Sequence, residues 1–240
     1  MANIVLVHGA WHGGWSWSPV ARRLRTAGHE VHAPTLTGVC ERIHLATPET
    51  GVSVHVADIV NHIRFNELSD IVLVGHSYGG AVITGVASEL AGSIAALVYL
   101  DAFNIEESGT SLFDNSPEWR VKQLRDAADA YNGWQIPPDP LVPIWASSPE
   151  SHDILERLTT PHTLACFTEP ITLSGAEKTV ADRTYILCED YDPSPFQTFY
   201  ARYRDDPGWH TVRIPGKHDA PIATPDRVAR EIATVAARVR

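Results

Sequence analysis

The sequence has few cysteines and no long apolar run. Its 240 residues include three cysteines, Cys40, Cys166 and Cys188, which lie too far apart for a CxxC metal motif or the framework of a disulfide-rich domain. No apolar stretch approaches the roughly 18 to 20 residues that a membrane-spanning helix requires. The first residues, ANIVLVHGAW, lack the basic segment and the long apolar segment of a signal peptide. We therefore expect a cytoplasmic, reducing location.

Basic residues are also scarce. The chain has 19 lysines and arginines against 29 acidic residues, for a formal net charge of −10, which argues against nucleic acid or an anionic membrane surface as a partner. None of the 12 histidines stands in an HExxH-like arrangement, so we expect no metal site. Hydrophobic residues make up 44% of the chain, which is enough for the core of one domain spanning residues 1–240.

Short apolar runs alternate with amphipathic segments along most of the chain. Such alternation predicts an α/β fold, a mostly parallel sheet flanked by helices on both faces. Strands are expected at 4–7, 29–33, 71–74, 94–100, 184–188 and 209–214, and helices at 19–27, 52–65, 81–90, 196–204 and from 225 to the end.

The alternation breaks between the strands expected at 94–100 and 184–188. Residues 104–179 are rich in proline, tryptophan and serine, as in QIPPDPLVPIWASSP, and contain only short helical segments. An insertion of this size inside a compact domain is usually functional. We expect a lid or cap over a site, since this composition cannot supply a second core.

The motif with the clearest chemistry is GHSYG, at residues 75–79. It fits G-x-S-x-G, directly follows the apolar run IVLV and directly precedes a predicted helix. In that context the serine lies on a sharp strand-to-helix turn that exposes its hydroxyl, so Ser77 is the candidate nucleophile. A phosphate-binding loop is disfavoured because no lysine follows.

A serine hydroxyl needs a base and an oxyanion site. His218, in the loop IPGKHDAP between the last strand and the last helix, is the candidate base, whereas His76 beside the serine is interpreted as structural. The N–H of Tyr78, the residue after the nucleophile, is one expected oxyanion donor. Ala10, in the glycine-rich loop after the first strand, is the other.

Four segments carry a resemblance to a known family: VLVHGAWHGGWSW, VGHSYGG, LVYLDAF and GKHDA. They resemble the α/β-hydrolases of the plant methylesterase and hydroxynitrile lyase group, to which similar bacterial esterases belong. The resemblance covers nearly the whole chain and is weakest in the insertion. It implies an eight-stranded type of sheet with the lid after the sixth strand, no cofactor, Ser77 as nucleophile and His218 as base.

Two positions favour ester hydrolysis over cyanohydrin cleavage. The lyases of this group tend to have threonine where this chain has Gly9, and lysine where it has Asp219. Glycine leaves the oxyanion site open for an acyl carbonyl, and an aspartate cannot supply the cation that would stabilise leaving cyanide. The resemblance therefore implies a serine esterase that acts through an acyl-enzyme.

The acid of the catalytic triad stays open at this point. Asp190 has the best distance along the chain to His218, with Asp192 second, whereas Glu189 is too close to the strand end. The loop that carries them is about two residues shorter than in the methylesterases. Asp101, which ends the strand at 94–100, is an equal alternative, because some α/β-hydrolases take their acid from that position.

Aromatic residues of the insertion suggest an apolar pocket for a hydrophobic or aromatic ester. Trp11, Trp134 and Phe167 are the expected substrate contacts, with Trp119 and Trp145 as further candidates. The alternative is that these side chains only pack the insertion onto the body. Other functions that fit the same residues are a lyase, a natural-product lactone hydrolase or cyclase, and a slow-turnover receptor. The oligomeric state stays open, a homodimer included.

Overall fold

The centre of the molecule is a six-stranded sheet in which every described pairing is parallel. The computed structural model describes residues 1–138, 142–192 and 194–239, so part of the predicted insertion (139–141) and of the predicted last helix (Arg240) lies outside the described residues. The strand order is β2-β1-β3-β4-β7-β8. The strands are β1 (Asn3–Val7), β2 (Glu30–His32), β3 (Ile71–His76), β4 (Ile94–Leu100), β7 (Asp182–Cys188) and β8 (His210–Ile214).

The predicted α/β architecture is confirmed, but two details implied by the resemblance are wrong. The main sheet of the described residues has six strands rather than eight. The long insertion consequently follows β4, the fourth strand of this chain, and not a sixth strand.

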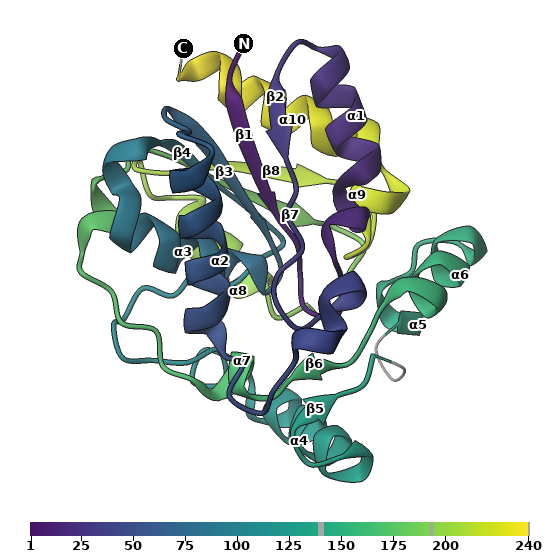
Figure 1. Ribbon diagram of the computed structural model, residues 1–240. Helices are drawn as coiled ribbons and strands as arrows, with labels where there is room; N and C mark the ends of the chain where they lie inside the picture. The colour runs from purple at the N-terminus through teal and green to yellow at the C-terminus, as the bar shows by residue number, and fades with distance from the viewer. Residues whose placement is uncertain (139–141, 193, 240) are drawn as a thin grey trace.

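Helices cover both faces of the sheet (Figure 1). One face carries α1 (Ser18–Thr26), α9 (Ala220–Ala223) and α10 (Pro225–Arg238); the other carries α2 (Val52–Phe65), α3 (Gly79–Leu90) and α8 (Gln197–Tyr203). Short 3-10 helices lie at η1 (Gly14–Trp17), η2 (Cys40–Leu45), η3 (Ala91–Ser93) and η4 (Ala176–Thr179). None of the helices described is both long and apolar enough to cross a bilayer.

The strands supply a core to each face by simple alternation. Ile4 and Leu6 of β1 pack in the cluster that α1 and α10 complete, whereas Val5 and Val7 pack in the cluster beneath α2 and α3. Successive side chains of a strand point to opposite faces, so a sheet covered on both sides needs apolar residues at every position. This explains the uninterrupted run at residues 4–7.

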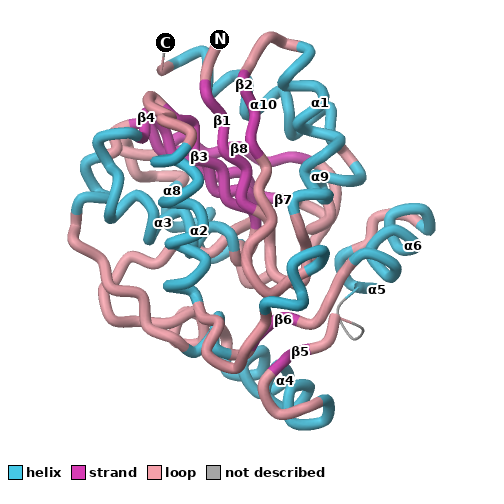
Figure 2. Tube along the Cα trace, viewed as in Figure 1, coloured by secondary structure: helices cyan, strands magenta, loops and turns pink. Residues whose placement is uncertain are grey.

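The residues between β4 and β7, called the insert below, form α4 (Glu118–Tyr131), β5 (Gln135–Ile136), α5 (Val142–Trp145), α6 (Pro149–Leu158), β6 (His162–Thr163) and α7 (Ala165–Thr168), followed by η4. Strands β5 and β6 pair antiparallel, and loops make up much of the rest (Figure 2). Leu124, Ile136 and Leu155 are buried in the same cluster as the α2–α3 face of the sheet. The insert therefore has no core separate from the body among its described residues.

The turn from β3 into α3 leaves no room for side chains on its glycines. A Cβ built on Gly75 would lie 2.5 Å from the carbonyl oxygen of Gly79, and a Cβ on Gly79 would lie 2.6 Å from the carbonyl oxygen of Val7. Between them Ser77 has φ 54°, a left-handed conformation that costs about 1–3 kcal/mol for a residue with a side chain. Close packing against β1 thus holds this turn in place.

We expect Gly75→Ala to destabilise the protein, because its methyl group would meet backbone atoms that cannot move aside. The free energy of unfolding in urea should fall by about 1–3 kcal/mol. Gly92→Ala is the matched control, since nothing lies within 4 Å of a Cβ at that position. Equal stability of the two variants would contradict this account of the turn.

Candidate active site

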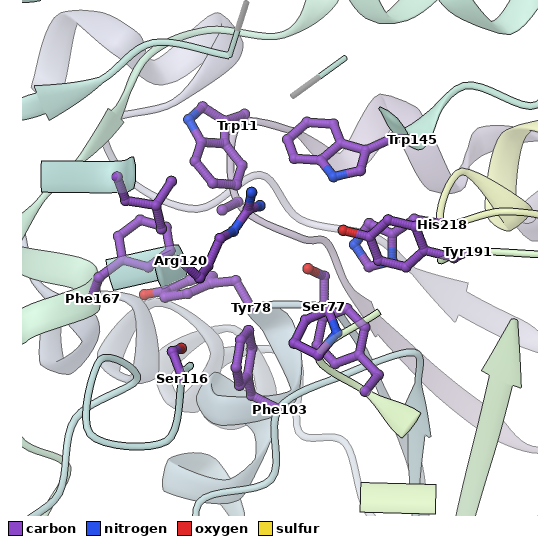
Figure 3. Close-up of a pocket in the computed structure, with 14 residues that line it drawn as sticks. Trp11, Ser77, Tyr78, Phe103, Ser116, Arg120, Trp145, Phe167, Tyr191 and His218 are labelled. Carbon is purple, nitrogen blue, oxygen red and sulfur yellow. The ribbon is translucent and has the colours of Figure 1, made fainter. Parts of the chain in front are cut away.

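Ser77 is held at the end of β3 by backbone hydrogen bonds on both sides. Its N–H donates to the Leu100 carbonyl at 3.2 Å, and its carbonyl accepts from the N–H groups of Gly80 and Phe103 at 3.1 Å each. The residue is 9% exposed and lines a pocket between the sheet and the insert. The strained turn therefore presents the hydroxyl at the floor of a cavity (Figure 3).

His218 lies in the loop between β8 and α9 and borders the same pocket. Its Nδ1 is 2.6 Å from Oδ2 of Asp101, so Nδ1–H donates to the carboxylate and Nε2 is left for the pocket. The ring stacks on Tyr191 and Phe196, with centroids 4.9 and 5.1 Å away. His76, predicted to be structural, places Nε2 2.9 Å from the backbone carbonyl of His218.

Asp101 is the carboxylate that the fold brings to the histidine. It directly follows β4, is fully buried and has φ 45°. Its N–H donates to the Ile186 carbonyl at 2.7 Å, and its Oδ1 accepts from the Cys188 N–H at 3.2 Å. Both partners belong to β7, so sheet pairing fixes the backbone and the second carboxylate oxygen together.

The acids of the loop after β7 do not reach His218. Asp190 is exposed and its Oδ2 accepts from the Gly216 N–H at 2.7 Å. Asp192 is exposed as well, and Glu189 pairs with Arg213 at 3.0 Å. The short loop places these carboxylates against the β8 side and solvent, so Asp190 is not the residue that the structure brings to the histidine.

Burial is the largest influence on the pKa values of both His218 and Asp101. It lowers the pKa of His218, because an imidazolium loses hydration there, and the nearby His12 and Arg120 lower that pKa further, against the opposing effect of Asp219. Burial also raises the pKa of Asp101, whereas the Cys188 N–H lowers it. A histidine with a lowered pKa stays neutral near pH 7, which is the form that accepts a proton.

The two predicted oxyanion donors face the same space. Ala10 and Tyr78 both line the pocket, and neither N–H donates a hydrogen bond within the part of the chain that the structure describes. The adjoining Trp11 has φ 65°, and its N–H donates to Nδ1 of His162 at 3.3 Å. These contacts hold the loop after β1 with the Ala10 N–H unused.

Aromatic and aliphatic side chains form most of the pocket wall (Figure 3). The lining residues are Ala10, Trp11, Ser77, Tyr78, Phe103, Ser116, Arg120, Leu124, Trp145, Phe167, Tyr191, Pro195, Phe196 and His218.

The predicted substrate contacts divide into two groups. Trp11, Trp145 and Phe167 line the pocket, and Trp11 lies 5.1 Å from Trp145 between ring centroids. Trp134 is not among the lining residues. It directly precedes β5, and its carbonyl accepts from the Leu164 N–H. Trp119 is 53% exposed because it precedes Arg120 on α4, and neighbouring helical residues point about 100° apart.

Several lining residues were missed by the sequence reasoning. Tyr191 and Phe196 belong to the loop after β7. Its three carboxylates indicated a source of the acid, and no pattern indicated that its aromatic residues line the pocket. Arg120 and Leu124 are spaced four apart on α4 and so share one helical face. The sequence shows this spacing, but it does not show which face of α4 packs toward the sheet.

His55 of α2 and His162 and Cys166 of the insert form a buried cluster. Ligand atoms of His55, His162 and Cys166 lie within 4.8 Å of one another. However, His55 hydrogen-bonds the Tyr78 hydroxyl through Nδ1 and the Thr37 carbonyl through Nε2. His162 accepts a backbone N–H at Nδ1, which places its own proton on Nε2 and removes that atom as a ligand. The cluster thus serves to hold Tyr78 and the loop after β1.

Asp219 joins the loop that carries His218 to the insert. It is buried, its Oδ2 accepts from the Ser147 N–H at 2.8 Å, and its Oδ1 accepts from the Ser147 hydroxyl. The same hydroxyl accepts from the Lys217 N–H at 3.3 Å. The acid that stands where the lyases tend to have lysine therefore ties the segment between α5 and α6 to the residue beside His218.

Comparisons with known proteins identify the family of the chain. The sequence model described as "Alpha/beta hydrolase family" matches residues 4–231. The chain is 41% identical over 245 residues to the carbendazim hydrolyzing esterase of Nocardioides sp. (strain SG-4G), across 98% of this chain and 100% of that protein. It is 36% identical over 117 residues to the pheophorbidase of Raphanus sativus, across 46% of this chain and 43% of that protein.

A solved structure gives the same fold. An extracellular α/β-hydrolase from a Paenibacillus species, described as sharing structural and functional homology with tobacco salicylic acid binding protein 2, superposes with a TM-score of 0.85 at 21% identity, across 98% of this chain and 99% of that one. The chain belongs to the α/β-hydrolase family. The predicted family is confirmed, and so is the expectation of an enzyme of the ester-hydrolysing class.

We expect Asp219→Ala to destabilise the protein, because it removes the buried carboxylate that accepts hydrogen bonds from the Ser147 N–H and hydroxyl. Hydrogen bonds to a charged group contribute about 1.5–3 kcal/mol, and urea unfolding should show a loss of that order. Asp153→Ala on α6 is the control, since this acid is exposed. A loss no larger than that of the control would show that Asp219 does not stabilise the contact between the insert and the loop of His218.

Proposed function

We propose that the protein is a serine esterase that cleaves a carboxylic ester of a hydrophobic small molecule through an acyl-enzyme. The observation that carries the proposal is the arrangement at one pocket of Ser77 on a strained turn, His218 bonded to the buried Asp101, and two unused backbone N–H groups. The identity with a named esterase over almost the whole chain supports the same reaction class.

The chemistry follows from the positions of these groups. Nε2 of His218 takes the proton of the Ser77 hydroxyl as its oxygen attacks the ester carbonyl, and the N–H groups of Ala10 and Tyr78 stabilise the oxyanion. The imidazolium then protonates the leaving alcohol. Water, deprotonated by the same histidine, cleaves the acyl-enzyme and restores the serine. Asp101 holds the tautomer and stabilises the imidazolium.

The insert acts as the cap of this site in our proposal. It contributes Trp145 and Phe167 to the pocket wall and is bonded to the catalytic loop through Ser147. Aromatic walls exclude water and favour flat or apolar substrate groups. Asp219 carries no positive charge that could stabilise leaving cyanide, which favours the esterase over the lyase.

Ser77→Ala should abolish ester hydrolysis, because no other group can form the acyl-enzyme. We expect kcat for short-chain aryl esters to fall by about 10⁴ or more, measured by release of the phenol. A fluorophosphonate should label the wild type at Ser77 and leave the variant unlabelled. Ser18→Ala, at an exposed serine of α1, is the control; hydrolysis retained by Ser77→Ala would overturn the proposal.

Asparagine substitutions should show by their effect on kcat which candidate acid belongs to the triad. Asp101→Asn presents an amide to His218 and favours the wrong tautomer, so kcat should fall by about 10⁴. Asp190→Asn and Asp192→Asn alter exposed carboxylates, and we expect changes of only about twofold. The measurement is steady-state hydrolysis of one aryl ester by all three variants. A larger loss in Asp190→Asn than in Asp101→Asn would reverse the assignment.

A further inference from the structure

Arg120 places a positive charge inside a pocket that is otherwise mostly apolar. It lies on α4 of the insert, is half-buried and lines the pocket with Ser77 and His218. Figure 3 shows its guanidinium among the lining side chains, between Trp11 and Ser77 in this view. Within the lining set, the other groups of ionisable type belong to the proposed catalytic machinery or to tyrosines, so this cation needs an explanation of its own.

The protein supplies no anion to this guanidinium among its described residues. Nη1 donates to the neutral Gln123 Oε1 at 2.8 Å. Lys122, on the same helix, pairs with Asp126 at 2.6 Å, whereas Arg120 forms no ion pair within residues 1–138, 142–192 and 194–239. The chain has ten more acids than bases, yet none of the acids in its described residues pairs with this pocket cation.

A structural role does not account for the side chain. Withdrawing a guanidinium from water without a counter-charge is unfavourable. Other arginines of the described chain stack on rings, as Arg125 does over Phe113 at 5.0 Å, but no such stacking involves Arg120. The neighbouring pocket hydroxyl of Ser116 donates to the Leu112 carbonyl, so it does not compensate the charge either.

We propose that Arg120 binds a carboxylate of the substrate, so that the preferred substrates are esters that carry a free carboxylate apart from the ester group, such as monoesters of dicarboxylic acids. This rests on the proposed esterase function. A guanidinium presents parallel N–H donors that match a carboxylate, and aromatic surroundings strengthen the pair by excluding water. The apolar walls would hold the carbon chain between the two ends.

Pairing of Arg120 with a substrate carboxylate would also change the pKa of His218, the proposed base. The charge of Arg120 lowers the pKa of His218. A substrate carboxylate that neutralises this charge therefore raises the basicity of the histidine once the substrate is in place. The preference for the anionic ester should accordingly appear in kcat as well as in KM.

Two esters of equal chain length test the proposal. Monomethyl glutarate carries a carboxylate where methyl pentanoate has its terminal methyl group, and methanol release measures both. We expect Arg120→Gln to lower the ratio of kcat/KM for glutarate over pentanoate by about 10- to 100-fold, the effect of one charge-assisted hydrogen-bonded pair. Arg120→Lys keeps the charge but not the paired donors, so its ratio should lie between those of the wild type and Arg120→Gln. Lys122→Gln, at an exposed position, should leave the ratio unchanged.

Binding measured without turnover separates this proposal from the esterase proposal. Calorimetry with monomethyl glutarate on Ser77→Ala should detect binding that the added Arg120→Gln substitution weakens about tenfold or more. Equal loss for both esters in Arg120→Gln, or binding that the second substitution does not change, would overturn carboxylate recognition. Absence of turnover with both esters and of fluorophosphonate labelling would overturn the esterase alone, since the binding experiment still decides the role of Arg120.

Discussion

The site depends on strained backbone at the carboxyl ends of three adjacent strands. Trp11 after β1, Ser77 after β3 and Asp101 after β4 all have positive φ although none is glycine. Each such residue costs about 1–3 kcal/mol and persists only where its surroundings determine it fully. Here the central part of the sheet provides that support, because β3 pairs with β1 on one side and β4 on the other. The strained residues carry the pocket wall, the proposed nucleophile and its acid.

Burial has opposite effects on the two members of the histidine–aspartate pair. It lowers the pKa of His218 and raises that of Asp101, so each group on its own would prefer to be neutral. The 2.6 Å hydrogen bond and the Cys188 N–H give the carboxylate two defined partners. The hydrogen bond thereby orients the ring of His218, the proposed base, and holds the carboxylate beside it.

The insert packs into a core that it shares with the sheet. Its buried apolar residues belong to the core beneath α2 and α3, and Asp219 bonds it to the loop of the proposed base. Through this attachment α4 brings Arg120 to the pocket. The proposed nucleophile and base, which the body supplies, and Arg120, which the insert supplies, therefore line one cavity.

The sequence by itself determined those features that depend on neighbouring residues. The apolar runs and helical periodicities predicted the α/β fold, and G-x-S-x-G between a strand and a helix placed Ser77, because strand pleat, helix pitch and a glycine turn are local properties. The loop between the last predicted strand and the last predicted helix offered His218 as the base, and the resemblance implied the same residue. These elements lie in the structure where they were expected.

Tertiary structure alone decided the partners that are distant in sequence. Asp101 and His218 are 117 residues apart, and along the chain Asp190 had looked closer. The pairing of β4 with β7 places Asp101 beside His218, whereas Asp190 accepts a hydrogen bond from the Gly216 N–H instead. The inward side of α4 was likewise set by packing, which turned Arg120 to the pocket and Trp119 to solvent. Distance along a chain does not measure distance in space, so contacts between separate elements could not be read from the residues in order.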